Sequence, residues 1–468
     1  MKIISHFFEK IKNSRTHLVL AILFCSLLIA CEDFLEIPPP TNQLTGELVF
    51  EDPATVEAAV INIYTQLRDN TLVTGDISGL PYLLGLYTDE LILTGNNTSS
   101  RFFYENSLLA SDTTISNIWD SSYNLIYASN AIIEGLENNT VLTEEEKSNF
   151  TGEAYFIRAF IHFYLVNVFG DIPYIKTSDY RVNSSVYKLN TDQVYEQIIE
   201  DLSLAKSLLP LAYTTPDRTR PNQAVASALL ARTYLFNQDW TNALDESLEL
   251  ITNLDYTLTP DLNQVFLNTT KETLWQFDTG IPGFNTLDAQ TYIFTSGPPP
   301  NCILSDALLN DFEPNDNRFT NWIAQVSDGT TVWHHAYKYK LNTTTGTTQE
   351  CSIVMRLAEL HLIAAESHAQ LNNIPDALTQ LNLIRERALL APVTASNKTD
   401  VLNAIYKERH LEFFCEMAHR FFDLKRTGRL DTSLETIKPN WNTNNRLLPI
   451  PESELILNPN LEPQNLGY

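Results

Sequence analysis

The fold of this chain is restricted most by a succession of paired segments whose apolar residues recur at the spacing of an α-helix. In the middle and C-terminal parts these segments are residues 191–209, 222–236, 240–250, 352–371, 375–390 and 401–422. Small side chains stand where neighbouring helices would touch: Ala224, Ala226, Ala228, Ala231, Ala358, Ala364, Ala365 and Ala369. Because small side chains let two helices approach closely, the pattern predicts helices that pack in consecutive pairs.

Further helices are predicted in the N-terminal part, over residues 53–68, 114–136 and 143–169. The last of these begins with a capping box, in which Thr143 accepts a backbone N–H bond and Glu146 reaches back. It ends at Gly170, a residue type common just after a helix. The paired helices are similar to helix–turn–helix repeats of the tetratricopeptide kind, at irregular spacing. The predicted fold class is therefore mostly α, with a scaffold of about four loose tetratricopeptide-like pairs.

Residues 253–350 interrupt the helical pattern and are predicted to be a loop-rich insertion. Within them, residues 273–277, 291–294 and 332–339 have the character of short strands, and clusters of Pro, Gly, Asn and Thr separate them. Residues 77–103 have the same mixed character. Binding sites are frequent on irregular segments held by a rigid scaffold. We therefore expect an irregular, loop-rich ligand-binding half that contains short β-hairpins.

The first 30 residues have the pattern of a bacterial lipoprotein signal peptide. A basic start precedes an apolar run that is too short to span a bilayer comfortably. The run ends at Ala30, and a small residue before a cysteine is typical of the site at which the thiol is acylated. We expect Cys31 to carry the lipid, residues 31–52 to form an extended tether, and residues 53–468 to form a single domain. An uncleaved membrane anchor is the alternative interpretation.

The formal net charge of −26 argues against nucleic acid as a partner, because phosphate binding depends on clustered Lys and Arg. It also disfavours peripheral binding to anionic lipid, whereas a neutral ligand meets no such penalty. Cys302, Cys351 and Cys415 are far apart and form no CxxC pair, so neither a metal site nor a disulfide framework is indicated. Buried free thiols are the favoured interpretation, and one disulfide among the three is the alternative.

The sequence contains none of the HExxH, GxSxG, P-loop or GxGxxG motifs. His334 and His335 are adjacent, so on a strand they would point to opposite faces and chelate a metal poorly. The charged stretch 408–426 invites a catalytic interpretation. Its carboxylates recur every four residues among phenylalanines, however, which favours a half-buried ion-pair network. Glycoside hydrolysis needs only two carboxylates that are distant in sequence, so it remains an alternative without a specific pair.

Several blocks of sequence match one family in the expected order. They are residues 152–173, 220–232, 408–426 and 448–468, and Asp33-Phe34-Leu35 follows Cys31 as a further match. Together they resemble the SusD/RagB family of outer-membrane nutrient-binding lipoproteins, although each block alone is a weak signal. The blocks span nearly the whole chain after the signal peptide. One departure lies at residues 463–466, where the family's ending is usually shorter, and it affects only the tail.

This resemblance implies one α-helical domain in which tetratricopeptide-like units support an irregular ligand-binding half. It implies a lipoprotein on the outer face of the outer membrane, attached through the lipid on Cys31. It also implies a partner, a SusC-like TonB-dependent transporter that the protein caps and to which it delivers glycans. The family carries no known catalytic residues, which agrees with the absence of catalytic motifs. Neither enzyme activity nor a cofactor is expected.

Sugar rings present apolar C–H faces to aromatic side chains and hydroxyl edges to polar ones, so loop residues of both kinds are the candidates for a glycan site. The segment 88–104 lies where the resemblance places an N-terminal binding loop. Its candidates are Asp89, Asn96, Arg101, Phe102 and Tyr104. The insertion and the preceding loop add, by region only, Tyr82, Trp275, Tyr292, Trp322 and Trp333. A core position is the alternative for Trp275, because it stands in a strand-like run.

Three functions are carried forward from the sequence. Capture of an oligo- or polysaccharide at the cell surface is favoured. A surface glycoside hydrolase and a repeat scaffold that binds peptides or proteins are the alternatives, because helical repeats support all three. Release of reducing sugar would favour the hydrolase, whereas transporter association without glycan affinity would favour the scaffold.

Overall fold

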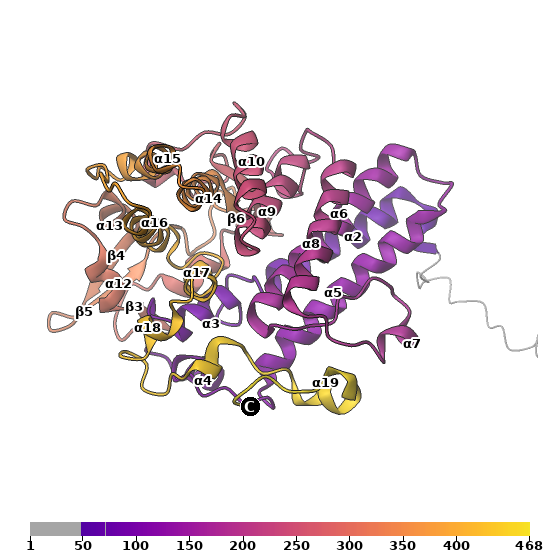
Figure 1. The fold of residues 1–468 in the computed structure, drawn as a ribbon, viewed down its shortest axis with the longest axis horizontal. Helices are drawn as coiled ribbons and strands as arrows, with labels where there is room; N and C mark the ends of the chain where they lie inside the picture. The colour runs from indigo at the N-terminus through magenta and orange to yellow at the C-terminus, as the bar shows by residue number, and fades with distance from the viewer. Residues whose placement is uncertain (1–47, 71) are drawn as a thin grey trace, which may run out of the picture. The chain divides into compact units, whose positions relative to one another are not determined.

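The computed structural model describes residues 48–70 and 72–468, of which residues Phe50–Tyr468 form one compact unit. The expected signal peptide, the expected lipidation site Cys31 and most of the expected tether lie outside the described residues. The described chain is mostly helical, with a few short strands (Figure 1). None of its helices combines the length and the apolar character that crossing a membrane would require.

The scaffold consists of long helices close to the positions that the apolar periodicity predicts. They are α2 (Pro53–Asp69), α5 (Thr113–Glu137), α6 (Glu144–Phe169), α8 (Thr191–Leu208), α9 (Gln223–Phe236), α10 (Trp240–Ile251), α14 (Leu357–Gln370), α15 (Ile374–Arg387) and α16 (Lys398–Phe413). Each packs on the next: α5 on α6, α6 on α8, α8 on α9, α9 on α10, and α14 on α15 (Figure 1). After the insertion the chain returns, and α14 packs on α10. This succession confirms the mostly α fold class with tetratricopeptide-like pairs.

Helix α6 shows how the local sequence sets the ends of an element. The backbone N–H of Glu146 donates to Thr143 Oγ1 at 3.2 Å, and the Thr143 N–H donates to Glu146 Oε2 at 2.9 Å. This is the predicted capping box. The helix ends at Gly170, whose φ of 78° lies in the region that glycine tolerates best. A side chain at Gly170 would also meet Leu447 at 2.9 Å, so this turn is closely packed against the C-terminal segment.

The remaining elements are short, and most of them belong to the irregular half or to the C-terminal segment. The helical ones are η1 (Leu48–Glu51), α3 (Leu80–Tyr87), α4 (Thr98–Tyr104), α7 (Tyr180–Asn183), η2 (Leu262–Gln264), α11 (Leu287–Tyr292), α12 (Asp306–Asp311), α13 (Asn317–Trp322), α17 (His419–Arg426), α18 (Leu430–Leu434), η3 (Thr443–Arg446), α19 (Glu452–Leu457) and η4 (Pro459–Leu461). The strands are β1 (Leu91–Leu93), β2 (Thr273–Phe277), β3 (Cys302–Leu304), β4 (Ile323–Ser327), β5 (Val332–Ala336) and β6 (Ser352–Arg356). In the described residues they pair antiparallel as β1–β3, β2–β6 and β4–β5. The β4–β5 pair is a short β-hairpin of the expected kind.

The structure corrects several local expectations. Strand β6 was expected to be the first turn of α14, but its residues pair with β2 in the buried interior. Residues 291–294 were expected to be a strand, but Thr291 and Tyr292 are the end of the helix α11 and the other two residues follow it. Thr286 caps the N-terminus of this helix by accepting from the Ala289 N–H at 3.0 Å. Residues 77–103 contain the helix α3, which is buried on every side and therefore has no polar face to reveal its period.

The expected helix over residues 401–422 is two helices, α16 and α17, joined by a tight turn. Three residues of this turn have left-handed φ angles: Cys415, Met417 and Ala418. Their conformation cannot continue a right-handed helix. The turn lets Glu412 and Glu416, which were expected on one helix stripe, both face the same group of cations in the interior.

A fully buried ion-pair cluster joins this turn to the insertion. Glu412 accepts from Arg356 at 2.6 Å, from Arg318 at 3.2 Å and from Arg387. Arg356 also donates to Glu416 at 2.8 Å. The three arginines hold the pKa of the Glu412 carboxyl well below its usual range, against the opposing effect of burial. The expected network is therefore present, but it lies in the core and is not half-buried.

Candidate ligand-binding surface

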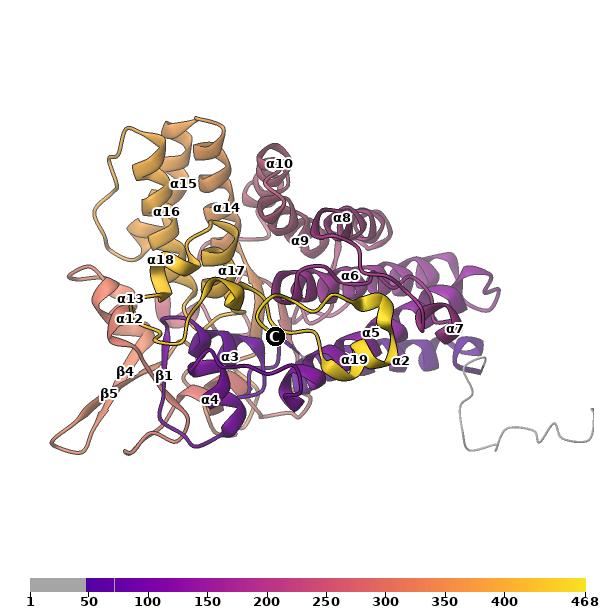
Figure 2. The ribbon, with the colours of Figure 1, turned by 60° about the horizontal axis from the view of Figure 1, so that its bottom comes forward.

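Three segments that are far apart in the sequence meet beside the short sheets. Strand β1 pairs with β3, and β3 lies beside β5. Figure 2 shows β1 near the β4–β5 hairpin. This arrangement brings together residues 94–97, which follow β1, residues 295–301, which precede β3, and residues 332–335 on β5. We call these segments the three-loop surface. Two of the candidate glycan residues, Asn96 and Trp333, belong to it.

The first two segments are joined through their backbones. The N–H groups of Thr94 and Gly95 both donate to the carbonyl oxygen of Asn301, each at 3.0 Å. A side chain at Gly95 would come within 2.4 Å of the Pro300 carbonyl oxygen, so the close approach requires glycine. Asn96 follows directly and is exposed. Its amide is therefore presented to solvent from a segment with a fixed backbone.

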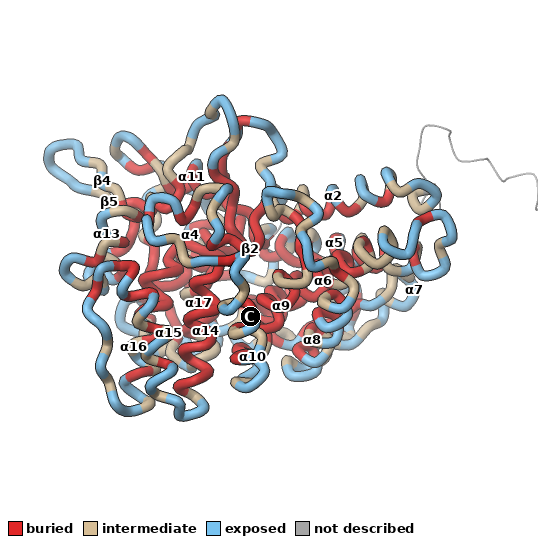
Figure 3. Tube along the Cα trace, turned by 90° about the horizontal axis from the view of Figure 1, so that it is seen from above, coloured by how far each residue is buried: buried red, intermediate tan, exposed pale blue. Residues whose placement is uncertain are grey.

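The third segment contacts the second through an aromatic ring. The indole of Trp333 lies against Gly297, because a Cβ added there would be 2.1 Å from the ring. Two residues along β5, on the same face, His335 packs against Phe294 with 4.9 Å between ring centroids. Trp333 itself stays partly exposed, and the tip of its hairpin is exposed in Figure 3. Asn96 and Trp333 thus flank one loop, residues 295–301.

Helix α4 carries three other candidates in different surroundings. Arg101 is exposed, and Phe102 is half-buried against the core. Tyr104 is also half-buried, and the ammonium of Lys438 lies 4.1 Å from the centre of its ring. One face of that ring is therefore already occupied. Arg101 is the member of this helix that is freest to reach a ligand near Asn96.

Asp89 is held in a buried ion pair behind these loops. Its carboxylate accepts from Arg420 at 2.5 and 2.8 Å, and this pairing lowers its pKa to about 2 despite burial. The neighbouring Glu90 is buried too, and burial together with the charge of Asp89 raises its pKa to about 8. Glu90 Oε1 lies 3.9 Å from His410 Nε2. Both carboxylates belong to the support of the surface and have little contact with solvent.

The four other aromatic candidates lie in the core. Trp275 and Trp322 are 0% exposed, Tyr82 is 2% exposed and Tyr292 is 5% exposed. The Trp275 indole N–H donates to a backbone carbonyl at 3.2 Å, and that of Trp322 does so at 2.9 Å. Such bonds satisfy the polar end of a buried indole. No face of these rings is open to a sugar, and we do not include them in the proposed site.

One aromatic side chain near the hairpin was not singled out from the sequence. Phe319 on α13 is 37% exposed, and its ring lies 6.3 Å from that of the half-buried His334. His334 is on the face of β5 opposite Trp333, as its place in the sequence indicated. The only sequence signal for Phe319 was that it is an aromatic residue in the loop-rich insertion. Only the fold shows that it stands next to this hairpin.

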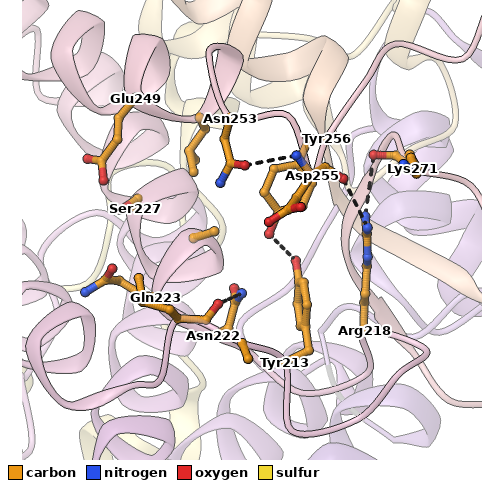
Figure 4. Close-up of a pocket in the computed structure, with 14 residues that line it drawn as sticks. Tyr213, Arg218, Asn222, Gln223, Ser227, Glu249, Asn253, Asp255, Tyr256 and Lys271 are labelled. Atoms are coloured by element: carbon orange, nitrogen blue, oxygen red, sulfur yellow. Dashed lines mark hydrogen bonds between the residues drawn. The ribbon is translucent and has the colours of Figure 1, made fainter.

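A separate hollow of about 260 Å³ lies in the helical scaffold, beside α9 and α10 (Figure 4). On one side the hydroxyls of Tyr213 and Tyr256 are 2.7 Å apart, with the Arg218 guanidinium over both rings. Arg218 donates to backbone carbonyls, among them that of Asp255 at 3.3 Å. These groups bond to one another and brace the loop between α8 and α9. The hollow contains none of the candidate glycan residues.

We looked among the described residues for metal ligands and for reactive thiols. Residues 48–70 and 72–468 contain no group of three or more His, Cys, Asp or Glu side chains placed to hold a metal ion. Within the same residues Cys302, Cys351 and Cys415 are free and buried, which confirms the favoured interpretation of the thiols. Burial raises the pKa of the Cys351 thiol to about 12, so it stays protonated at neutral pH.

Comparison with known proteins decides the family. Residues 33–235 match a family model described as "Starch-binding associating with outer membrane", and residues 310–468 match the model of the SusD family. A SusD-like protein P2 from Formosa agariphila is 30% identical, over 96% of this chain and 98% of the relative. The chain belongs to the SusD family.

Solved SusD-like structures share the fold. A SusD superfamily protein from Parabacteroides distasonis superposes with a TM-score of 0.77 at 22% identity, covering 91% of this chain and 100% of the other. Surface glycan-binding protein A from Bacteroides thetaiotaomicron, in complex with laminarihexaose, superposes with a TM-score of 0.74 at 19% identity, covering 88% and 99%. The mostly helical scaffold with a few short strands is thus the SusD fold.

The two family matches leave out residues 236–309 of this SusD-like chain. That interval contains residues 295–301, the middle segment of the three-loop surface. The blocks on which the resemblance was based lie outside this interval, for example residues 152–173 in and after α6 and residues 448–468 at the C-terminus. Part of the candidate surface therefore lies in sequence that neither model describes.

Proposed function

We propose that this SusD-like protein captures a glycan at the three-loop surface and delivers it to a SusC-like TonB-dependent transporter. The observation that carries the proposal is the meeting of Asn96 and Trp333 on either side of one loop. A partly exposed indole offers a face to the C–H side of a sugar, and an exposed amide offers bonds to its hydroxyls. The laminarihexaose complex of surface glycan-binding protein A supports a glycan as the ligand.

The proposed site consists of Asn96 and Trp333, with Arg101 at its edge. Asp89 and Tyr104 support it, since each is committed to a cation. Phe102 packs against the hydrophobic core. The protein acts without catalysis in this proposal, and the two carboxylates just before β1, Asp89 and Glu90, are buried. Overnight incubation with a bound glycan should release no reducing sugar, and release that is lost in a carboxylate variant would favour the hydrolase.

Calorimetric titration of the full chain, purified from membranes in detergent, tests the proposal. Laminarihexaose and maltohexaose are the first ligands, followed by longer neutral and anionic polysaccharides. Replacing Trp333 by Ala should weaken binding by about 1–3 kcal/mol, the range found for one stacking ring. Val332→Ala is the matched control, because Val332 is exposed on the same strand but is aliphatic. Equal affinity of the Trp333→Ala and control variants would remove Trp333 from the site.

Anchoring and delivery are part of the same proposal. Acylation of Cys31 would hold the protein at the outer membrane, and Cys31→Ala should abolish incorporation of labelled palmitate and release the protein from the membrane fraction. A SusC-like barrel should copurify with the wild-type chain in mild detergent. Copurification of such a barrel with a chain that binds no glycan would favour a protein-binding scaffold.

A further inference from the structure

A cleft of about 720 Å³ lies away from the three-loop surface. Its walls are α5, the segment 173–186 that includes α7, and the C-terminal segment that includes α19. Figures 1 and 2 both show α19 beside α5 and α7. The volume is in the range of sites that hold small molecules or short oligomers. None of the candidate residues above lines this cleft, whose C-terminal wall lies in the SusD-like block 448–468.

A row of aromatic rings follows one face of α5 into the cleft. Trp119, Tyr123 and Tyr127 are spaced four residues apart, which places them one above another on the helix. The first two rings are 4.8 Å apart, and the Tyr123 hydroxyl is fixed by donating to the Pro173 carbonyl at 2.9 Å. Tyr127 is 53% exposed, and Tyr180 on α7 is 77% exposed. The cleft thus offers successive ring faces, of which the outer ones are open to a ligand.

Polar groups without a counter-charge line the same cleft. Asp120 and Asn124 on α5 are exposed, and Glu454 on α19 is half-buried. Among the described residues no Lys or Arg lines the cleft. Burial raises the pKa of Glu454, and the charge of Asp120 raises it further. The lining therefore combines hydrogen-bond acceptors with aromatic faces and offers no cation to an anionic ligand.

We propose that this cleft is a second glycan-binding site, which takes an uncharged oligosaccharide. This proposal rests on the proposed function, which is that the protein captures glycans. A sugar chain matches the row of rings with its C–H faces, and its hydroxyls can donate to Asp120 and Glu454. An apolar partner would bury these carboxylates without compensation. Glycans with carboxylate or sulfate groups are disfavoured, because no cation is present in the lining to receive them.

Hydroxyl-radical footprinting with mass spectrometry tests the cleft and the three-loop surface separately in one experiment. The full chain is oxidised with and without saturating laminarihexaose, maltohexaose or cellohexaose. We expect at least one of these saccharides to lower the oxidation of both Tyr127 and Tyr180 several-fold. Tyr187 is the internal control, because it is 69% exposed and lies outside the lining. Trp333 reports on the three-loop surface.

The outcomes separate the two proposals. Protection of the two cleft tyrosines without protection of Trp333 would support the cleft and overturn the three-loop site. Protection of Trp333 while Tyr127 and Tyr180 react like Tyr187 would overturn the cleft. No protection at either place by any of the three saccharides would overturn the cleft as a site for uncharged oligosaccharides.

Variants in a Trp333→Ala background measure the cleft alone. Replacing both Tyr127 and Tyr180 by Ala should weaken the remaining binding about tenfold or more, from the usual contribution of stacking rings. Asp120→Asn with Glu454→Gln should weaken it less, and Tyr187→Ala should leave it unchanged. Exposed aliphatic residues such as Ile456 and Leu457 border the cleft. If the tyrosine variants keep glycan affinity and lose only a copurifying membrane protein, the face is a protein interface and the proposal is wrong.

Discussion

The helical scaffold and the three-loop surface are held together by different kinds of contact. In the scaffold, side chains of neighbouring helices carry the packing; for example, Arg232 on α9 donates to Glu359 on α14 at 2.6 Å, and both are almost fully buried. At the three-loop surface glycines allow close approach, to backbone at Gly95 and to the Trp333 ring at Gly297. Asn96 is left to face solvent, and Trp333 stays partly exposed. The comparison shows how one scaffold can present different side chains without changing its fold.

The largest effect that this comparison predicts is in the buried ion-pair cluster. Glu412→Gln keeps the shape of the side chain but leaves Arg318, Arg356 and Arg387 with one carboxylate fewer. Breaking a buried pair in this way lowers the free energy of unfolding by about 3–5 kcal/mol. Urea unfolding followed by circular dichroism measures the change. Glu435→Gln, at an exposed position after α18, is the matched control. A loss no larger than that of the control would mean that the cluster contributes little to stability.

Trp275 and Trp333 allow a second test of the comparison. Both were candidate glycan residues, but only Trp275 is in the core. Trp275 packs edge-on against Phe156 and Phe160, with 5.1 Å between ring centroids in each pair. Trp275→Ala should therefore lower the free energy of unfolding by about 3–5 kcal/mol. Trp333→Ala should change it by about 0.5 kcal/mol or less, the usual range at a surface. Thermal unfolding of both variants measures this, and a stable Trp275→Ala variant with impaired glycan binding would return Trp275 to the site.

The scaffold could be predicted from the sequence because its signals are local. The capping box at Thr143 and the apolar period of α5 need only neighbouring residues, and the structure confirms them. The meeting of Asn96 with Trp333 depends on strand pairing across more than 200 residues, and no local pattern encodes it. Aromatic composition alone could not separate Trp333 from Trp275 and Trp322. Burial decides between them, and burial is a property of the whole fold.

The junction between the two regions should respond to pH through Glu90. Its folded-state pKa of about 8 is well above the ordinary value, so the folded protein retains a proton that the unfolded chain loses near pH 4.5. Between these pH values the free energy of unfolding should fall as pH rises, by up to about 1.4 kcal/mol per pH unit. Glu90→Gln should remove this part of the slope. Urea titrations of both proteins at pH 5, 6 and 7 measure it, and parallel slopes would show that Glu90 is ionised in the folded state.

The smallest expected effect concerns the glycine under the Trp333 ring. A Cβ at residue 297 would lie 2.1 Å from the indole, so in Gly297→Ala the ring must move away from the 295–301 loop. The atoms nearest to such a Cβ all belong to the Trp333 ring, so the thermal midpoint should stay close to that of the wild type. Glycan affinity should fall by about 1 kcal/mol, less than on removal of the whole ring. Gly329→Ala is the matched control, since Gly329 in the hairpin turn has open space around it, although its φ of 91° adds local strain. If Gly297→Ala binds as tightly as the wild type while Trp333→Ala does not, the ring is used by the ligand in a position that the loop does not fix.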